Sequence, residues 1–139
     1  MTISISPASH EEVHSGGIGG RLREYNYAHV GEYPPTQYVH LNARADDGRV
    51  VGGLRAFVFL YWLRIEVLFV DEDHRGQGIG ARLLSEAERL ARDLGAKNAA
   101  LETFEFQAPQ FYAKQGYVEV SRIEGYAKDF YLATLRKAL

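Results

Sequence analysis

The stretch Arg75-Gly76-Gln77-Gly78-Ile79-Gly80 decides the fold and the function that the sequence predicts. Its three glycines leave backbone N–H groups uncovered, and Arg75 adds a fixed positive charge. A helical pattern begins immediately afterwards, at Ala81. Uncovered donors, a cation and the positive end of a helix dipole therefore converge on one point, which predicts a site that holds a phosphate group.

The run from Ala81 to Leu94 predicts an amphipathic helix with one apolar face. The residues of that face are Leu83, Leu84, Ala87, Leu90, Ala91 and Leu94. Glu88 precedes Arg92 by four residues, which is the favourable order for an ion pair on a helix surface. Gly95 is placed to end the helix.

Short strands and two further helical regions are predicted around this helix from alternating and helical apolar patterns. The strands cover residues 3–5, 39–44, 50–61, 62–70, 99–106, 117–123 and 129–135, and the helical regions cover residues 10–29 and a segment opening with Gln107-Ala108-Pro109. Glycines within residues 16–20 weaken the first helical region, where we expect a break or two short helices. The junction at Tyr61-Trp62 carries no turn residue, so the position of that turn stays open.

This order of elements indicates the fold class. Three adjacent strands before the long helix indicate an antiparallel meander, and the unit from Trp62 to Phe106 indicates one parallel pair joined by a crossover helix. We therefore expect a single domain spanning residues 1–139. Its class is α/β, with a mixed, mostly antiparallel sheet of six to seven strands that helices flank.

Composition argues against several classes of protein. The net charge of −2 gives no basic field to attract nucleic acid, and the absence of cysteine removes disulfides and thiolate metal sites. The longest apolar run, residues 56–70, is interrupted by two charges and is shorter than the ~20 residues that span a bilayer. His10 and His14 have metal-ligand spacing but no third ligand, so no metal is expected. A soluble, cytoplasmic protein is the expectation.

Other phosphate sites fit the glycine stretch less well. The spelling Gly76-x-Gly78-x-x-Ala81 satisfies a loose dinucleotide fingerprint, but five residues separate Val70 from Gly76 and only one parallel crossover is visible. A P-loop needs Gly-Lys-Ser/Thr, which is absent. A plain strand-to-helix turn would explain one glycine and not three glycines with an arginine.

Two motifs together resemble the GNAT superfamily of N-acetyltransferases. Arg75, Gly78 and Gly80 match its Arg/Gln-x-x-Gly-x-Gly/Ala loop, and the stretch Phe111-Tyr112-Ala113-Lys114-Gln115-Gly116-Tyr117 resembles its Phe/Tyr-Tyr-x-Lys-x-Gly-Phe/Tyr segment. The resemblance covers roughly Val51 to the C-terminus, and the first 50 residues match only in element order. It implies a GNAT-like fold whose parallel pair splays apart, with acetyl-CoA as co-substrate and no metal.

The resemblance also implies which residues bind the donor. The pyrophosphate would be held by amides of the segment Arg75, Gly76, Gln77, Gly78, Ile79, Gly80 and Ala81. The backbone of Leu68, Phe69 and Val70 would pair with the pantetheine arm, and an N–H near Leu68 would polarise the thioester carbonyl. The family often has an asparagine before the second motif; here Gln107 offers the same amide in a different position.

Tyr112 is predicted to be the general acid that protonates the departing thiolate, as the family position implies. The alternative is a core aromatic residue, since helical spacing favours only one of Phe111 and Tyr112 facing the core. Glu66 is the leading general base for the amine, directly or through water, and its alternative is a charge on the solvent face of the sheet. Glu102 and Glu105 remain further candidates.

The acceptor side is less defined. Tyr25 and Asn26 lie in the region that often lines the acceptor pocket of this superfamily, and Tyr61 adds aromatic surface; ordinary packing is the alternative. Residues 16–20 form either a mobile lid or a poor helix. A small-molecule amine is favoured over a peptide, because no acidic groove for lysine-rich tails is evident. A homodimer is permitted, and nothing demands one.

An acetyl-CoA-dependent N-acetyltransferase that works by direct attack of a primary amine is the leading hypothesis. A non-catalytic acyl-CoA-binding sensor or regulatory domain is the alternative, and a nucleotide-binding regulatory domain is a third. Tyr112 favours the enzyme over the sensor.

Overall fold

The computed structural model describes all residues, 1–139, and the chain forms two compact units. The first covers residues 1–33 and the second covers residues 34–139, and each is described by itself. The prediction of a single domain over residues 1–139 is not tested by this division and stays a prediction.

The first unit consists of an irregular N-terminal segment and two helices, α1 (His10–His14) and α2 (Gly17–Val30). Ser9 starts α1 with a reciprocal capping box to Glu12, and Gly16 separates the helices with a left-handed φ of 73°. The expected break is therefore confirmed. The strand predicted at residues 3–5 is wrong: Ile3 and Ile5 are exposed and pair with no other strand, and an unpaired segment gains no ladder hydrogen bonds.

The second unit is a six-stranded mixed sheet with helices, in the order β1-β2-β3-β4-β6-β5. The strands are β1 (Gln37–Arg44), β2 (Val50–Phe59), β3 (Trp62–Val70), β4 (Asn98–Phe104), β5 (Val118–Ala127) and β6 (Phe130–Ala138). The helices are the short 3-10 turn η1 (Glu72–His74), α3 (Ile79–Asp93) and α4 (Pro109–Lys114). The predicted fold class is confirmed, including the final hairpin and the single parallel pair.

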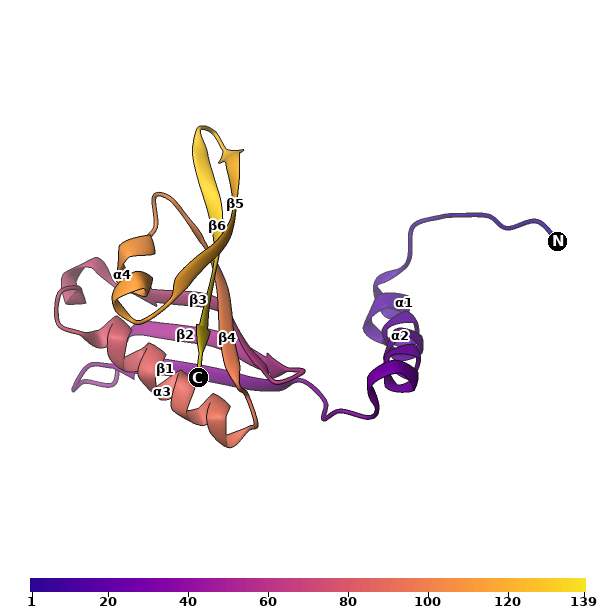
Figure 1. Cartoon of the computed structure of the whole chain (residues 1–139), viewed down its shortest axis with the longest axis horizontal. Coiled ribbons are helices and arrows are strands. Elements are labelled where there is room, and N and C mark those ends of the chain that lie inside the picture. Colours follow the sequence, from indigo (N-terminus) through magenta and orange to yellow (C-terminus); the bar gives the residue numbers. More distant parts are fainter. The chain divides into compact units, whose positions relative to one another are not determined.

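Helix α3 covers one face of β1, β2 and β3 (Figure 1). The core between them contains fully buried leucines from each layer, among them Leu54, Leu63 and Leu84. The predicted apolar face of α3 is confirmed at its centre, where Ala87 and Ala91 are completely buried. Small residues at these two positions let the helix backbone approach the sheet closely.

Two tight turns connect the three strands of the antiparallel meander, β1, β2 and β3. Asp46-Asp47-Gly48 makes the predicted turn between β1 and β2, with Gly48 at a φ of 86°. The turn between β2 and β3 is Leu60-Tyr61, and both residues have positive φ, at 47° and 69°. Side chains with a Cβ rarely adopt this conformation, which is why no sequence signal marked the turn. No helix of the chain is long and apolar enough to cross a membrane.

Candidate active site

The parallel pair β3–β4 opens halfway along its length. Its register runs from Trp62 opposite Asn98 to Ile65 opposite Leu101 and then ends, although β3 continues to Val70. Beyond that point β4 remains paired with β6 on its other side. The backbone of β3 after Ile65 therefore has no strand partner on the side of β4.

A bulge lies at the residue where the pair opens. Arg55 on β2 pairs with Val67 and Ala56 pairs with Ile65, so Glu66 is the extra residue. Leu63 and Ile65 are buried before the bulge, whereas Leu68 and Val70 pack on the core after it. The extra residue thus shifts the alternation of β3 by one position and turns its strand direction away from β4.

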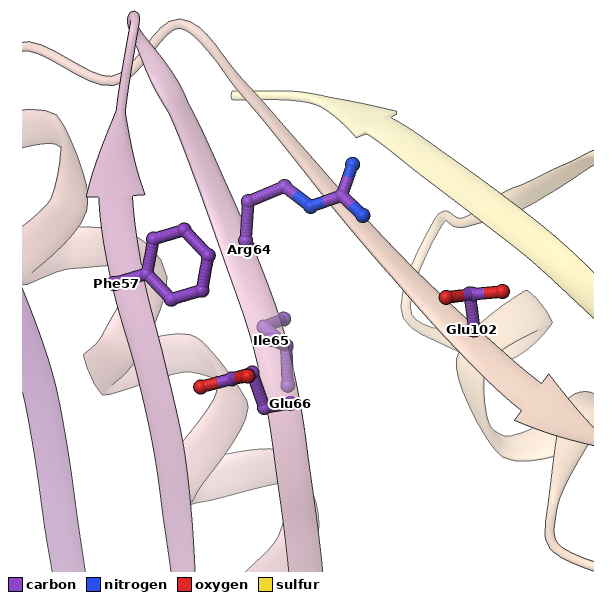
Figure 2. Close-up of a pocket in the computed structure, with 5 residues that line it drawn as sticks. All are labelled: Phe57, Arg64, Ile65, Glu66 and Glu102. Carbon is purple, nitrogen blue, oxygen red and sulfur yellow. The ribbon is translucent and has the colours of Figure 1, made fainter. Parts of the chain in front are cut away.

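A cavity of about 250 Å³ lies at this opening. Its lining residues come from three neighbouring strands: Phe57, Arg64, Ile65, Glu66 and Glu102. Figure 2 shows the Glu66 carboxylate pointing toward Phe57, and the Arg64 guanidinium extending toward β4, the strand that carries Glu102. The cavity therefore combines two carboxylates, one cation and one aromatic wall. Glu105, the third candidate base, lies just beyond the end of β4, where one of its oxygens accepts a hydrogen bond from the Tyr131 N–H at 3.3 Å.

The glycine stretch connects the end of β3 to the start of α3. Gly76 and Gly78 have φ values of 77° and 79°, and a Cβ at either position would meet nothing within 4 Å. Open space therefore lies beside both backbones. Gly78 is the N-cap of α3, and no side chain caps the helix. The first N–H groups of α3 are consequently available to bind an anion. The positive end of the helix dipole would favour such binding.

Arg75 is held against the end of β3. Its Nε donates a hydrogen bond to the carbonyl oxygen of Val70 at 2.8 Å, and its guanidinium lies 5.2 Å from the ring centroid of Phe69. These contacts leave the charge of Arg75 fixed beside the glycines. The arginine thus shapes the loop in addition to supplying the positive charge that the sequence predicts.

The two sequence motifs touch at Gly80 and Phe111. A Cβ on Gly80 would lie 3.4 Å from Cζ of Phe111, so the start of α3 lies close to the Phe111 ring of α4. Phe111 and Tyr112 both pack against the core, with their rings 5.1 Å apart. The expectation that only one of the two would face the core is wrong, because α4 is short and lies at the edge of the core.

Tyr112 is largely removed from solvent, and burial raises the pKa of its hydroxyl above the ordinary value. A raised pKa keeps the phenol protonated at neutral pH, which is the state that a proton donor needs. The side-chain oxygen of Gln107 accepts a hydrogen bond from the Phe104 N–H at 2.8 Å. This oxygen therefore terminates β4, and the contact of Gln107 with a pantetheine arm stays a prediction.

Glu88 occupies a position that the sequence did not predict. Its side chain is buried, and it accepts hydrogen bonds from the Tyr117 hydroxyl at 2.8 Å and from Lys137 Nζ at 2.9 Å. The predicted surface pair with Arg92 is therefore wrong. Sequence spacing along α3 could not reveal partners 29 and 49 residues away.

The predicted acceptor residues belong to two different units of the chain. Tyr25 and Asn26 belong to α2 in the first unit, where Asn26 donates to the Tyr33 hydroxyl at 3.2 Å. Tyr61 lies in the β2–β3 turn, at the end of β3 opposite to the glycine stretch. Their role in acceptor binding stays a prediction.

Comparisons with known proteins agree with this geometry. A family profile described as "Acetyltransferase (GNAT) domain" matches residues 36–119. The chain is 37% identical over 106 residues to blasticidin-S acetyltransferase of Streptomyces morookaense, a match that covers 76% of this chain and 78% of the relative. It is also similar to an acetyltransferase of Bacillus cereus, with 31% identity, a TM-score of 0.88 and coverage of 99% and 98% of the two chains.

A more distant structure shares the fold alone. An aminoglycoside 6'-N-acetyltransferase complexed with coenzyme A is 18% identical, with a TM-score of 0.66 and coverage of 73% of this chain and 72% of that chain. The overall fold is thus shared with a protein whose structure was determined in complex with coenzyme A.

Proposed function

We propose, from the fact that this chain belongs to the GNAT family of acetyltransferases, that it transfers the acetyl group of acetyl-CoA to a primary amine of a small, cationic molecule. One observation carries the proposal. The start of α3, which no side chain caps, follows β3, the strand whose pairing with β4 ends at Ile65. The first feature suits a pyrophosphate, and the second leaves a backbone edge open to an extended arm.

The donor would be bound along β3 and the glycine stretch. The residues proposed for the pyrophosphate are those of the glycine stretch and the first turn of α3, namely Arg75, Gly76, Gln77, Gly78, Ile79, Gly80 and Ala81. Gly76 and Gly78 suit this role because open space borders both backbones. The backbone edge of Leu68, Phe69 and Val70 that faces away from β2 would accept the pantetheine arm as a further strand. The thioester would then lie near the opening at Ile65 and Leu101.

The reaction would proceed by direct attack. The amine nitrogen forms a bond to the thioester carbonyl carbon, while a backbone N–H near Leu68 stabilises the developing oxyanion. The carbon–sulfur bond then breaks, and the electron pair leaves with sulfur. The proton from the Tyr112 hydroxyl goes to that sulfur. The proton lost by the amine goes to Glu66, directly or through water.

Glu66 is supported as the base by its place at the bulge, on the wall of the cavity. An ammonium ion has no lone pair, so a carboxylate near the nitrogen can first attract the cation and then accept its proton. Glu102 lies on the opposite strand of the same cavity and adds a second negative charge for a cationic acceptor. Phe57 offers an aromatic wall against which a flat or apolar part of the acceptor can pack.

The name of the relative in Streptomyces morookaense, blasticidin-S acetyltransferase, supports an antibiotic such as blasticidin-S as one member of this acceptor class. A thiol-release assay with acetyl-CoA tests the proposal across antibiotics of this kind, polyamines, amino acids and peptides. Transfer to a cationic small amine is expected. Tight binding of CoA without transfer to any amine would favour the acyl-CoA sensor instead.

The cellular location follows as part of the same proposal. The protein is proposed to be cytoplasmic and to act as one acetyltransferase domain over residues 1–139. Fractionation of cells that express the full chain tests this point.

A further inference from the structure

We propose that Glu88, Tyr117 and Lys137 form a positioning network that fixes the ring of Tyr112 for proton transfer. The proposal rests on the proposed role of Tyr112 as general acid. It assigns a purpose to a buried charged group that the proposed reaction does not otherwise use.

The network connects three elements that are distant in sequence. Glu88 on α3 accepts from the Tyr117 hydroxyl through Oε2 at 2.8 Å and from Lys137 Nζ through Oε1 at 2.9 Å. Both carboxylate oxygens are therefore engaged, one by a residue that precedes β5 and one by a residue of β6. The ammonium of Lys137 also lies 5.6 Å from the ring centroid of Tyr117, which adds a cation–π contact.

Gly116 lies beside this ion pair. It has a φ of 94°, and a Cβ on it would lie 3.4 Å from Cε of Lys137. The lysine stem therefore crosses the glycine on its way to Glu88. The glycine of the second sequence motif thus follows α4 in a left-handed conformation and lies against the stem of Lys137.

Tyr117 contacts Tyr112 in two ways. Its backbone N–H donates to the Tyr112 carbonyl oxygen at 3.0 Å, and the two rings meet edge to face with centroids 6.0 Å apart. Tyr117 is only 3% exposed, so its hydroxyl needs a partner inside the protein, and Glu88 is that partner. Burial, and then the hydrogen bond to Glu88, raise the pKa of Tyr117, which keeps its hydroxyl a donor.

These contacts explain why a charged group is retained in the core. A buried carboxylate is costly unless it is paired and hydrogen-bonded, and an apolar residue would pack α3 against the sheet equally well. What an apolar residue could not do is accept the hydrogen bond that anchors the hydroxyl end of the Tyr117 ring. Because the Tyr117 ring forms one wall of the Tyr112 site, its fixed position restricts the direction in which the Tyr112 hydroxyl points.

The test is a double-mutant cycle on turnover. Tyr117→Phe keeps the ring and removes the bond to Glu88, and we expect kcat to fall about fivefold to tenfold with KM for acetyl-CoA unchanged. In a Tyr112→Phe background the same change should alter kcat by less than about twofold, because a positioning residue has no effect once the group it positions is gone. An equal loss in both backgrounds, or no loss in the wild-type background, would overturn the network.

Two substitutions at Glu88 give a second readout. Glu88→Gln keeps an acceptor oxygen for Tyr117, and Lys137, which is 25% exposed, can turn to water, so kcat should stay within about twofold of wild type. Glu88→Leu removes the acceptor, and its kcat should match that of Tyr117→Phe. Equal turnover of the Gln and Leu variants would overturn the proposal.

The control is Glu86→Gln on the same helix. Glu86 pairs with Arg89 at 2.6 Å on the exposed face, so its loss should leave kcat unchanged. Wild-type turnover by Tyr112→Phe alone would instead overturn the acid assignment itself. Different variants therefore test the two assignments: Tyr117→Phe and the Glu88 variants test the positioning network, and Tyr112→Phe tests the general acid.

Discussion

Ile65 on β3 and Leu101 on β4 form the last parallel pair of the sheet, and the next residue of β3, Glu66, is a bulge. The parallel pairing of β3 with β4 therefore ends directly before the bulge. Because the bulge bends β3, the two strands diverge, and the cavity with Glu66 and Glu102 lies where they part. The predictions below concern the groups around this opening.

Glu66→Gln should lower kcat/KM for the amine on the order of tenfold to a hundredfold at neutral pH, because the amine loses its proton acceptor. The loss should shrink as pH rises, since more of the free amine is already deprotonated. Steady-state rates between pH 7 and pH 10 check this. Glu102→Gln is the matched comparison on the facing strand, and an equal or larger loss there at every pH would transfer the role of base to Glu102.

Gly78→Ala should weaken CoA binding about tenfold. A side chain at a φ of 79° costs about 1–2 kcal/mol, and relief of that strain would displace the amides at the start of α3. Calorimetry with CoA measures the change. Gly48→Ala is the control, because Gly48 has a φ of 86° and equally open space but lies in the β1–β2 turn. If both variants weakened CoA binding to a similar extent, the glycine stretch would have no specific role in binding the donor.

The glycine stretch and α3 could be predicted because their signals are local. Three glycines with an arginine and an apolar face at helical spacing each arise within a few residues, and the structure contains both. The bulge at Glu66 could not be predicted in this way. It depends on which residues of β2 face which residues of β3, and no turn or glycine in the sequence marks it.

Glu88 illustrates a second limit of sequence reasoning. Its spacing from Arg92 suggested a solvent-exposed pair, but tertiary packing turned the side chain inward to Tyr117 and Lys137. Ile3 and Ile5 illustrate the reverse case. Their alternation with serine resembles a strand, yet a strand needs a partner, and none pairs with them.

Leu84→Ala should destabilise the protein by about 2–5 kcal/mol, because it leaves a cavity between α3 and the sheet. Leu84 is 1% exposed, and it packs in the same core as Leu54 and Leu63. Urea denaturation measures the free energy of unfolding. Leu94→Ala, at the exposed end of the same helix, should cost about 1 kcal/mol or less. Equal losses would mean that the core does not depend on this contact.

Tyr112→Phe should lower kcat on the order of a hundredfold while the affinity for CoA stays the same, because the departing thiolate loses its proton donor. Burial raises the pKa of Tyr112, so the hydroxyl stays protonated and the wild-type rate should not decline up to about pH 10, the ordinary tyrosine value. The loss in the variant should become smaller above the pKa of the CoA thiol, where the thiolate needs no proton. Tyr126→Phe, an exposed tyrosine of β5, is the control.

The most direct test of the account is thiol release from acetyl-CoA by the wild-type chain, with cationic small amines as acceptors and mass spectrometry of the products. The account predicts that CoA thiol appears in step with an acceptor that carries one added acetyl group, and that Tyr112→Phe slows both together. Binding of acetyl-CoA with no acetylated product from any amine, or thiol release that Tyr112→Phe leaves unchanged, would contradict it.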